Sequence, residues 1–169
     1  APDITIYITS LSKSIAPGLR VGYLCAPDHL IDPIGIAMRG DCRMATPLMA
    51  EIATRWIESG TARSMSDWQC EEVVRRQAVA SEALDGTYYE TDPSSYHLWL
   101  MLPEPWRAEE FVSQLHARKV VVLPAESFVI GRGHPPHAVR ICIGSAHNID
   151  HLRDGLSIIA EMIKTPSRP

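Results

Sequence analysis

The chain has 169 residues, 46% of them hydrophobic, which suffices for one domain or for a small domain plus part of another. Its 16 basic and 20 acidic residues give a formal net charge of -4, which argues against a nucleic-acid-binding face on this segment. No apolar run approaches the roughly 20 residues of a membrane span, and no positively charged leader opens the chain.

The first part of the chain predicts two short strands followed by two helices. Ile4–Thr9 and Val21–Cys25 are rich in β-branched, aromatic and aliphatic residues, as strands are. A helix is expected over residues 27–38. A second helix begins at Pro47, since proline suits a first helical turn, and ends by Gly60.

A longer helix is expected next. Ser66 and Gln69 have the spacing of a capping box, which predicts a helix from there to about Leu84, ended by Asp85-Gly86. Its charged residues predict one solvated face: Glu71, Glu72, Arg75 and Arg76.

The last part of the chain predicts a compact α+β unit. Residues 96–102 are nearly all apolar, which predicts a strand buried on both faces. The elements expected after it are a helix over 109–119, a strand over 120–123, a loop over 124–136, a strand over 139–143 and a helix from about Asn148. Alternation along the strand 139–143 places Arg140 and Cys142 on the face opposite Val139, Ile141 and Ile143.

The two early strands are too few for a stable sheet. Residues 1–25 are therefore expected to be the edge of a larger sheet whose other strands are encoded upstream. Such an edge leaves apolar surface uncovered, and we expect it to drive self-association or local disorder near the N-terminus.

The segment from Thr9 to Tyr23 contains side chains that could bind a phosphate and react with an aldehyde. Ser10, Ser12 and Arg20 provide hydroxyls and a guanidinium, the groups that hold a phosphate. Lys13 between them suggests a Schiff base with pyridoxal phosphate. The alternative is a solvated loop lysine, as most lysines are.

The pattern Ser10-x-Ser12-Lys13-x-x-x-Pro17-Gly18-Leu19-Arg20-x-Gly22-Tyr23 resembles the cofactor-lysine segment of class I aminotransferases, the fold-type-I pyridoxal-phosphate proteins. It resembles most the branch found in MocR-type regulators of the GntR family, where an aminotransferase-like domain follows an N-terminal winged-helix DNA-binding domain. Four further segments share the resemblance: 47–50, 55–62, 96–100 and 139–144.

The resemblance implies roles for individual residues. Lys13 would bind the cofactor aldehyde, Ser10 and Ser12 would donate hydroxyls to its phosphate, and Arg20 would neutralise that phosphate. Arg140 would bind the α-carboxylate of a substrate through two parallel hydrogen bonds. The alternative for Arg140 is a structural salt bridge or an edge-strand arginine that points to water.

The implied fold class is α/β, as the C-terminal part of the pyridoxal-phosphate-dependent transferase fold. Residues 1–84 would be the end of the large cofactor-binding domain with its connecting helices, and residues 85–169 the small domain. In this family the groups that hold the pyridine ring lie upstream of the lysine, and a second subunit of a homodimer completes the site. We therefore expect this chain alone to bind pyridoxal 5′-phosphate weakly or not at all.

The implied function is that of a pyridoxal-phosphate-binding effector domain in a GntR/MocR-type transcription regulator. Its effector would be an amino acid or amine, and DNA would be bound only through another domain. One alternative is a genuine amino-acid aminotransferase, in which Lys13 is the general base of a proton shift. Another is a binding module that has lost the cofactor.

Three other motifs give weaker indications of function. The S-x-x-K spacing of Ser10 and Lys13 also occurs in serine β-lactamases, but the K-T-G and S-D-N elements of that mechanism are absent. His147 and His151 have metal-ligand spacing without a third ligand, so no metal site is expected. The cysteines Cys25, Cys42, Cys70 and Cys142 form no C-x-x-C pair, which predicts free thiols and a cytoplasmic location.

Overall fold

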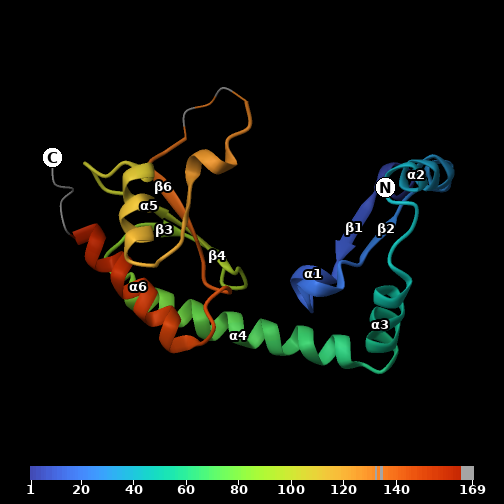
Figure 1. Ribbon diagram of the computed structural model, residues 1–169, viewed down its shortest axis with the longest axis horizontal. Coiled ribbons are helices and arrows are strands. Elements are labelled where there is room, and N and C mark those ends of the chain that lie inside the picture. Colours follow the sequence, from blue (N-terminus) through green and yellow to red (C-terminus); the bar gives the residue numbers. More distant parts are fainter. Residues whose placement is uncertain (132, 134, 165–169) are drawn as a thin grey trace. The chain divides into compact units, whose positions relative to one another are not determined.

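The computed structural model describes residues 1–131, 133 and 135–164. The chain divides into two compact units, Ala1–Gln69 and Cys70–Pro169, and the boundary falls inside helix α4, Thr61–Ala83 (Figure 1). Each unit has its own hydrophobic core. The boundary expected from the family resemblance, after residue 84, lies just past the end of the same helix and stays a prediction.

The first unit consists of a two-stranded antiparallel sheet, short helical turns and longer helices. Its elements before α4 are η1 (Pro2–Ile4), β1 (Tyr7–Ser10), α1 (Leu11–Ser14), η2 (Pro17–Leu19), β2 (Gly22–Cys25), α2 (Asp28–Asp41) and α3 (Pro47–Glu58). In the sheet, Tyr7 lies opposite Cys25 and Ser10 lies opposite Gly22. The expected first strand is shifted, because Pro2 begins a 3-10 turn that includes Ile4.

The core of the first unit is built largely by the connection between β1 and β2. Its buried residues are Leu11, Ile15, Leu19, Val21, Ala53 and Ala62. Trp56 of α3 and Met65 of α4 pack against them. The Gln69 side-chain amide donates a hydrogen bond to the Ile15 carbonyl at 2.8 Å. The connection therefore rests on α3 and on the beginning of α4.

The capping box expected at Ser66 is wrong, because α4 begins at Thr61. The Ser59 hydroxyl accepts a hydrogen bond from the Thr61 amide at 3.4 Å, and Gly60 takes a positive φ of 79° that separates α3 from α4. Ala62 and Met65 then pack into the core of the first unit. The helix starts earlier because its first turn buries apolar surface there.

The strands of the first unit expose large apolar side chains, as expected for a sheet edge. Tyr7 and Ile8 of β1 and Leu24 of β2 are 63%, 70% and 43% exposed. We expect the chain to self-associate with rising concentration because this surface is costly to leave in water. Light scattering after size exclusion measures the mass.

A matched pair of variants tests whether the strand surface causes that association. Ile8→Lys should shift the equilibrium toward monomer. Ile130→Lys, at an apolar side chain of the second unit that is 98% exposed, should leave the association unchanged. A chain that stays monomeric at every concentration would contradict the prediction.

The second unit is a four-stranded antiparallel sheet that packs against the second part of α4 and against two later helices. Besides the second part of α4, its elements are β3 (Tyr89–Glu90), β4 (His97–Met101), α5 (Ala108–Ala117), β5 (Leu123–Pro124), η3 (Ala125–Phe128), β6 (Ala138–Cys142) and α6 (Ile149–Lys164). The strand order is β3-β4-β6-β5. Strand β3 was not expected, and of the expected strand 120–123 only Leu123 pairs with β6, together with Pro124 from the expected loop.

One face of this sheet is buried by α4, α5 and α6. Leu98 and Leu100 of β4 share a core with Phe111 of α5 and Leu156 of α6. The other face of β4 carries His97, Trp99 and Met101, which are only half-buried. The expectation that residues 96–102 are buried on both faces is therefore wrong. In β6 the expected alternation is confirmed, since Val139 and Ile141 are buried whereas Arg140 and Cys142 are half-buried.

The expectation that Arg76 lies on a solvated face of α4 is wrong, because its side chain is buried and the residue is only 8% exposed. Its guanidinium pairs with Glu72 at 2.8 Å and donates to the carbonyls of Ile143 and Ala146 at 2.8 and 2.9 Å. These bonds tie α4 to the turn that follows β6. The i, i+4 spacing of charges gave no sign of this, because the acceptors are backbone atoms far along the chain.

Gly144 lies in that turn, pressed against Tyr96. A Cβ at residue 144 would lie 2.6 Å from Tyr96 Cδ1. We expect Gly144→Ala to lower the free energy of unfolding by about 1–3 kcal/mol, because the aromatic ring must move.

Gly155 inside α6 is the matched control. A Cβ there would meet nothing within 4 Å, so Gly155→Ala should raise the free energy of unfolding by about 0.5–1 kcal/mol through helix propensity. Urea titration followed by circular dichroism measures both variants. Equal effects of the two would contradict the contact with Tyr96.

Candidate cofactor and carboxylate sites

Ser10 closes the loop that carries the candidate cofactor residues. It ends β1 and caps α1, with its hydroxyl oxygen accepting the Ser12 amide at 3.1 Å. The same hydroxyl donates to the Val21 carbonyl at 3.3 Å, and the Leu11 amide donates to that carbonyl at 3.1 Å. The chain thus leaves the sheet at Ser10 and returns at Gly22 through one small closed loop, with α1 at the end of the two-stranded ribbon (Figure 1).

Lys13 and Arg20 both lie on this loop and are both exposed. Lys13 is in α1, and Arg20 follows η2 in the left-handed region at φ 51° and ψ 33°. Neither cation forms an ion pair or hydrogen bond with any residue that the structure describes. Two uncompensated cations on one short loop are suited to an anionic ligand.

The donors of this loop fit the phosphate and aldehyde end of pyridoxal phosphate. A phosphate needs hydroxyl donors and a cation, and an aldehyde needs an amine. The Ser12 hydroxyl has no partner among the described residues and is available to donate. Ser10 has already committed its one hydroxyl proton to Val21, so it would have to release that long bond to donate to a phosphate.

Arg140 belongs to the second unit, on the half-buried face of β6. It lies opposite Trp99 of β4 and Leu123 of β5. Its Nε atom is buried and has no hydrogen-bond partner, and no described carboxylate pairs with its guanidinium. Phe128 lies over the guanidinium, with 4.5 Å between the ring centroid and Cζ. Since an unpaired donor is costly to bury, this arginine is suited to bind an external acceptor.

The aromatic residues beside Arg140 were missed by reasoning from the sequence. Phe128 lies in the segment expected to be a loop, where the structure places the short helix η3. Trp99 lies in a strand that was expected to be buried on both faces. That expectation gave no reason to place Trp99 on the half-buried face of the sheet, beside Arg140. The register of β4 against β6, which sequence periodicity does not give, brings Trp99 and Arg140 together.

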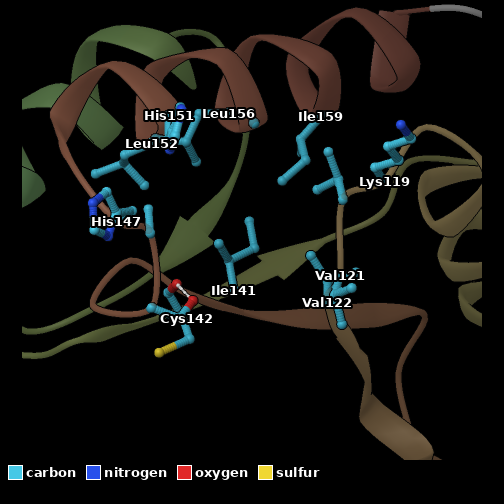
Figure 2. Close-up of a pocket in the computed structure, with 14 residues that line it drawn as sticks. Lys119, Val121, Val122, Ile141, Cys142, His147, His151, Leu152, Leu156 and Ile159 are labelled. Atoms are coloured by element: carbon cyan, nitrogen blue, oxygen red, sulfur yellow. Dashed lines mark hydrogen bonds between the residues drawn. The ribbon is translucent and has the colours of Figure 1, made fainter.

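His147 and His151 lie close to one another near the start of α6. Their ring centroids are 6.2 Å apart, and no group of three metal-binding side chains occurs among the described residues. Both are exposed near the start of α6, where Asn148 caps the helix through its bond to the His151 amide at 2.8 Å. Figure 2 shows them at one end of a cavity of about 310 Å³, whose walls include Leu156 of α6 and Ile141 of β6. None of the residues expected to bind cofactor or substrate lines it.

Comparison with known proteins decides the family. The profile of aminotransferase class I and II matches residues 1–156. The chain belongs to the class I and II aminotransferase family. Its resemblance to the aminotransferase-like domains of GntR/MocR-type regulators, expected from the Lys13 segment, is likewise confirmed.

Relatives of this aminotransferase-like domain include regulators and an enzyme. The HTH-type transcriptional regulator YdeF of Bacillus subtilis is 31% identical over 163 residues, covering 96% of this chain and 35% of YdeF. YisV of the same organism, also an HTH-type transcriptional regulator, is 24% identical over 92% of this chain and 32% of YisV. Aromatic-amino-acid aminotransferase 1 of Thermococcus litoralis is 25% identical, covering 94% of this chain and 39% of the enzyme.

Solved aminotransferases share the fold of the domain. The multiple substrate aminotransferase of Thermococcus profundus has a TM-score of 0.79 at 24% identity, over 94% of this chain and 40% of that one. The kynurenine aminotransferase of Pyrococcus horikoshii, solved in complex with PMP, has a TM-score of 0.80 at 20% identity over the same shares. The expected α/β fold is thus confirmed, and the chain spans about two fifths of the length of these structures. No described helix has the length and apolar character needed to cross a membrane.

Proposed function

We propose that this chain is the pyridoxal-phosphate-binding part of an effector domain in a GntR/MocR-type transcription regulator. The observation that carries the proposal is the closed loop from Ser10 to Gly22, in which the side chains of Ser12, Lys13 and Arg20 have no hydrogen-bond or ion-pair partner among the described residues. The similarity to YdeF over nearly the whole chain supports a regulator as the parent protein.

The residues of the loop have distinct parts in this proposal. Ser12 donates a hydroxyl hydrogen bond to the phosphate, and Arg20 provides the cation that offsets its charge. Ser10 shapes the loop by capping α1 and joins the phosphate contacts if it releases Val21. When bound, pyridoxal phosphate supplies an aldehyde that condenses with amines and a ring that withdraws electrons. Lys13 offers the amine, and its Nζ can accept or donate a proton nearby.

The effector in this proposal is an amino acid or an amine. Arg140 would bind the carboxylate of an amino acid, because its buried Nε lacks a partner. The parent protein would be a homodimer that binds DNA through a separate domain. Four free cysteines are compatible with the reducing cytoplasm, the compartment in which such a regulator acts.

A genuine aminotransferase is the second candidate function. It is supported by the similarity to aromatic-amino-acid aminotransferase 1, together with the unpaired Arg140. In that case Lys13 would transfer a proton on the bound substrate in each turnover. Conversion of the cofactor to its amine form by the full-length protein, in the presence of an amino acid, would favour the enzyme over the regulator.

The chain offers an internal control for testing the cofactor site. It contains three lysines, Lys13, Lys119 and Lys164, and all three are exposed. We expect millimolar pyridoxal phosphate followed by borohydride to label Lys13 of the full-length protein well above the other two, as quantified by peptide mass spectrometry. Pyridoxal without the phosphate should show no such preference, because only the phosphate engages Ser12 and Arg20. Equal labelling of the three lysines by pyridoxal phosphate would overturn the proposal.

A further inference from the structure

The guanidinium of Arg140 has an aromatic neighbour and an unsatisfied donor. Its Cζ lies over the Phe128 ring, 4.5 Å from the ring centroid. A cation at this distance from an aromatic face is stabilised by the ring. The ring is not the oxygen acceptor that a guanidinium N–H needs, and Nε is buried without a hydrogen-bond partner among the described residues. Phe128 therefore stabilises the cation, and its N–H donors have no acceptor in the described part of the chain.

Phe128 is itself held in place from two directions. The Trp99 ring meets it edge to face, with centroids 5.8 Å apart and planes at 68°. Phe128 ends η3, which follows directly on β5, and β5 pairs with β6 through Pro124 opposite Val139. Arg140 is the residue after Val139 on the same strand. The ring is thus anchored both to the strand that carries the arginine and to the neighbouring strand.

We propose that Phe128 is a positioning residue for Arg140, which fixes the guanidinium so that its two Nη groups receive the carboxylate of an amino acid. This inference rests on the proposed function, in which Arg140 binds that carboxylate. A planar guanidinium binds a carboxylate through two parallel hydrogen bonds, so its orientation decides whether both can form. An arginine side chain loses considerable rotational freedom on binding, and the stacked ring removes part of that freedom beforehand.

The Arg140 Nε–Hε resonance of the 169-residue chain gives a direct readout. Its position in a ¹⁵N–¹H spectrum reports the ring of Phe128 before ligand is added, and its shift reports a carboxylate bound at the guanidinium. Propionate is the probe, and uncharged propionamide is its control. We expect a saturable shift with propionate and none with propionamide.

Variants at Phe128 separate positioning from folding. Phe128→Leu should weaken propionate binding roughly three- to tenfold by removing the cation–π contact. Phe128→Tyr keeps an aromatic face and should retain the affinity within about twofold. Ile130→Ala, at a fully exposed side chain shortly after η3, is the matched control and should bind as the parent chain does. Circular dichroism confirms that each variant folds.

The outcomes distinguish this inference from the proposed function. A parent chain whose Arg140 resonance ignores propionate would overturn the positioning role and the binding of a carboxylate by Arg140, and would leave the pyridoxal-phosphate site of the Ser10–Gly22 loop to the labelling experiment. A parent chain that binds propionate, with Phe128→Leu binding it equally well, would overturn only the positioning role. Loss of affinity in Phe128→Leu, with recovery in Phe128→Tyr, would establish it.

Discussion

Replacing Arg76 with alanine is expected to lower the free energy of unfolding of the second unit by about 3–5 kcal/mol. The guanidinium is buried, pairs with Glu72 and donates to two backbone carbonyls. Its removal leaves the Ile143 and Ala146 carbonyls without these donors and Glu72 without its closest partner. Buried groups that lose their partners cost far more than the bond itself contributes.

Arg75 is the matched control for that experiment. It precedes Arg76 on the same helix, but its side chain is 60% exposed and its contacts with Glu71 and Glu72 are 3.4 and 3.7 Å long. Exposed pairs of this kind contribute little, so Arg75→Ala should change the free energy of unfolding by no more than about 0.5 kcal/mol. Urea unfolding followed by circular dichroism measures both. Similar losses in the two variants would mean that the bonds of Arg76 to the turn after β6 do not stabilise the unit.

Replacing Arg20 with asparagine is expected to reduce the phosphate-dependent labelling of Lys13 at least about tenfold. A charged hydrogen bond to an anion contributes about 1.5–3 kcal/mol, which corresponds to roughly ten- to a hundredfold in affinity. Asparagine is the appropriate replacement because Arg20 has a positive φ of 51°, a conformation that asparagine tolerates better than alanine does. The backbone of the loop is then retained while the cation is removed.

Arg43 provides the control for this variant within the same unit. It is also an exposed arginine with a positive φ, of 62°. Arg43→Asn removes the same charge at the same kind of backbone position, away from the Ser10–Gly22 loop. Labelling of Lys13 should be unchanged in it. A drop of equal size in both variants would show that net charge, and not a contact from Arg20, attracts pyridoxal phosphate.

The sequence was informative where local pattern and burial agree. Proline at the start of α3, asparagine at the cap of α6 and alternation along β6 each reflect a local rule, and the structure follows them. The candidate cofactor loop could be proposed for the same reason, since its donors lie within one short segment.

The errors came from contacts between distant segments. The apolar run 96–102 reads as doubly buried, yet the helices of the second unit share a core with only one face of its sheet. Arg76 reads as solvated, yet its acceptors are carbonyls near residue 145. Phe128 could be linked to Arg140 only once β5 was seen beside β6. Such pairings depend on register and layer order, which no single segment encodes.

The loop around Lys13 interleaves two sets of residues. Leu11, Ile15, Leu19 and Val21 form much of the first unit's core, while Ser12, Lys13 and Arg20 lie between them. Ala53 is fully buried in the same core as the apolar residues of the loop. Because protein interiors are closely packed, a larger side chain at Ala53 would displace Ser12, Lys13 and Arg20 together with those apolar residues. Substitutions in this shared core are therefore expected to change the thermal stability of the unit and its affinity for a ligand together, whereas substitutions at the exposed donors change the affinity alone.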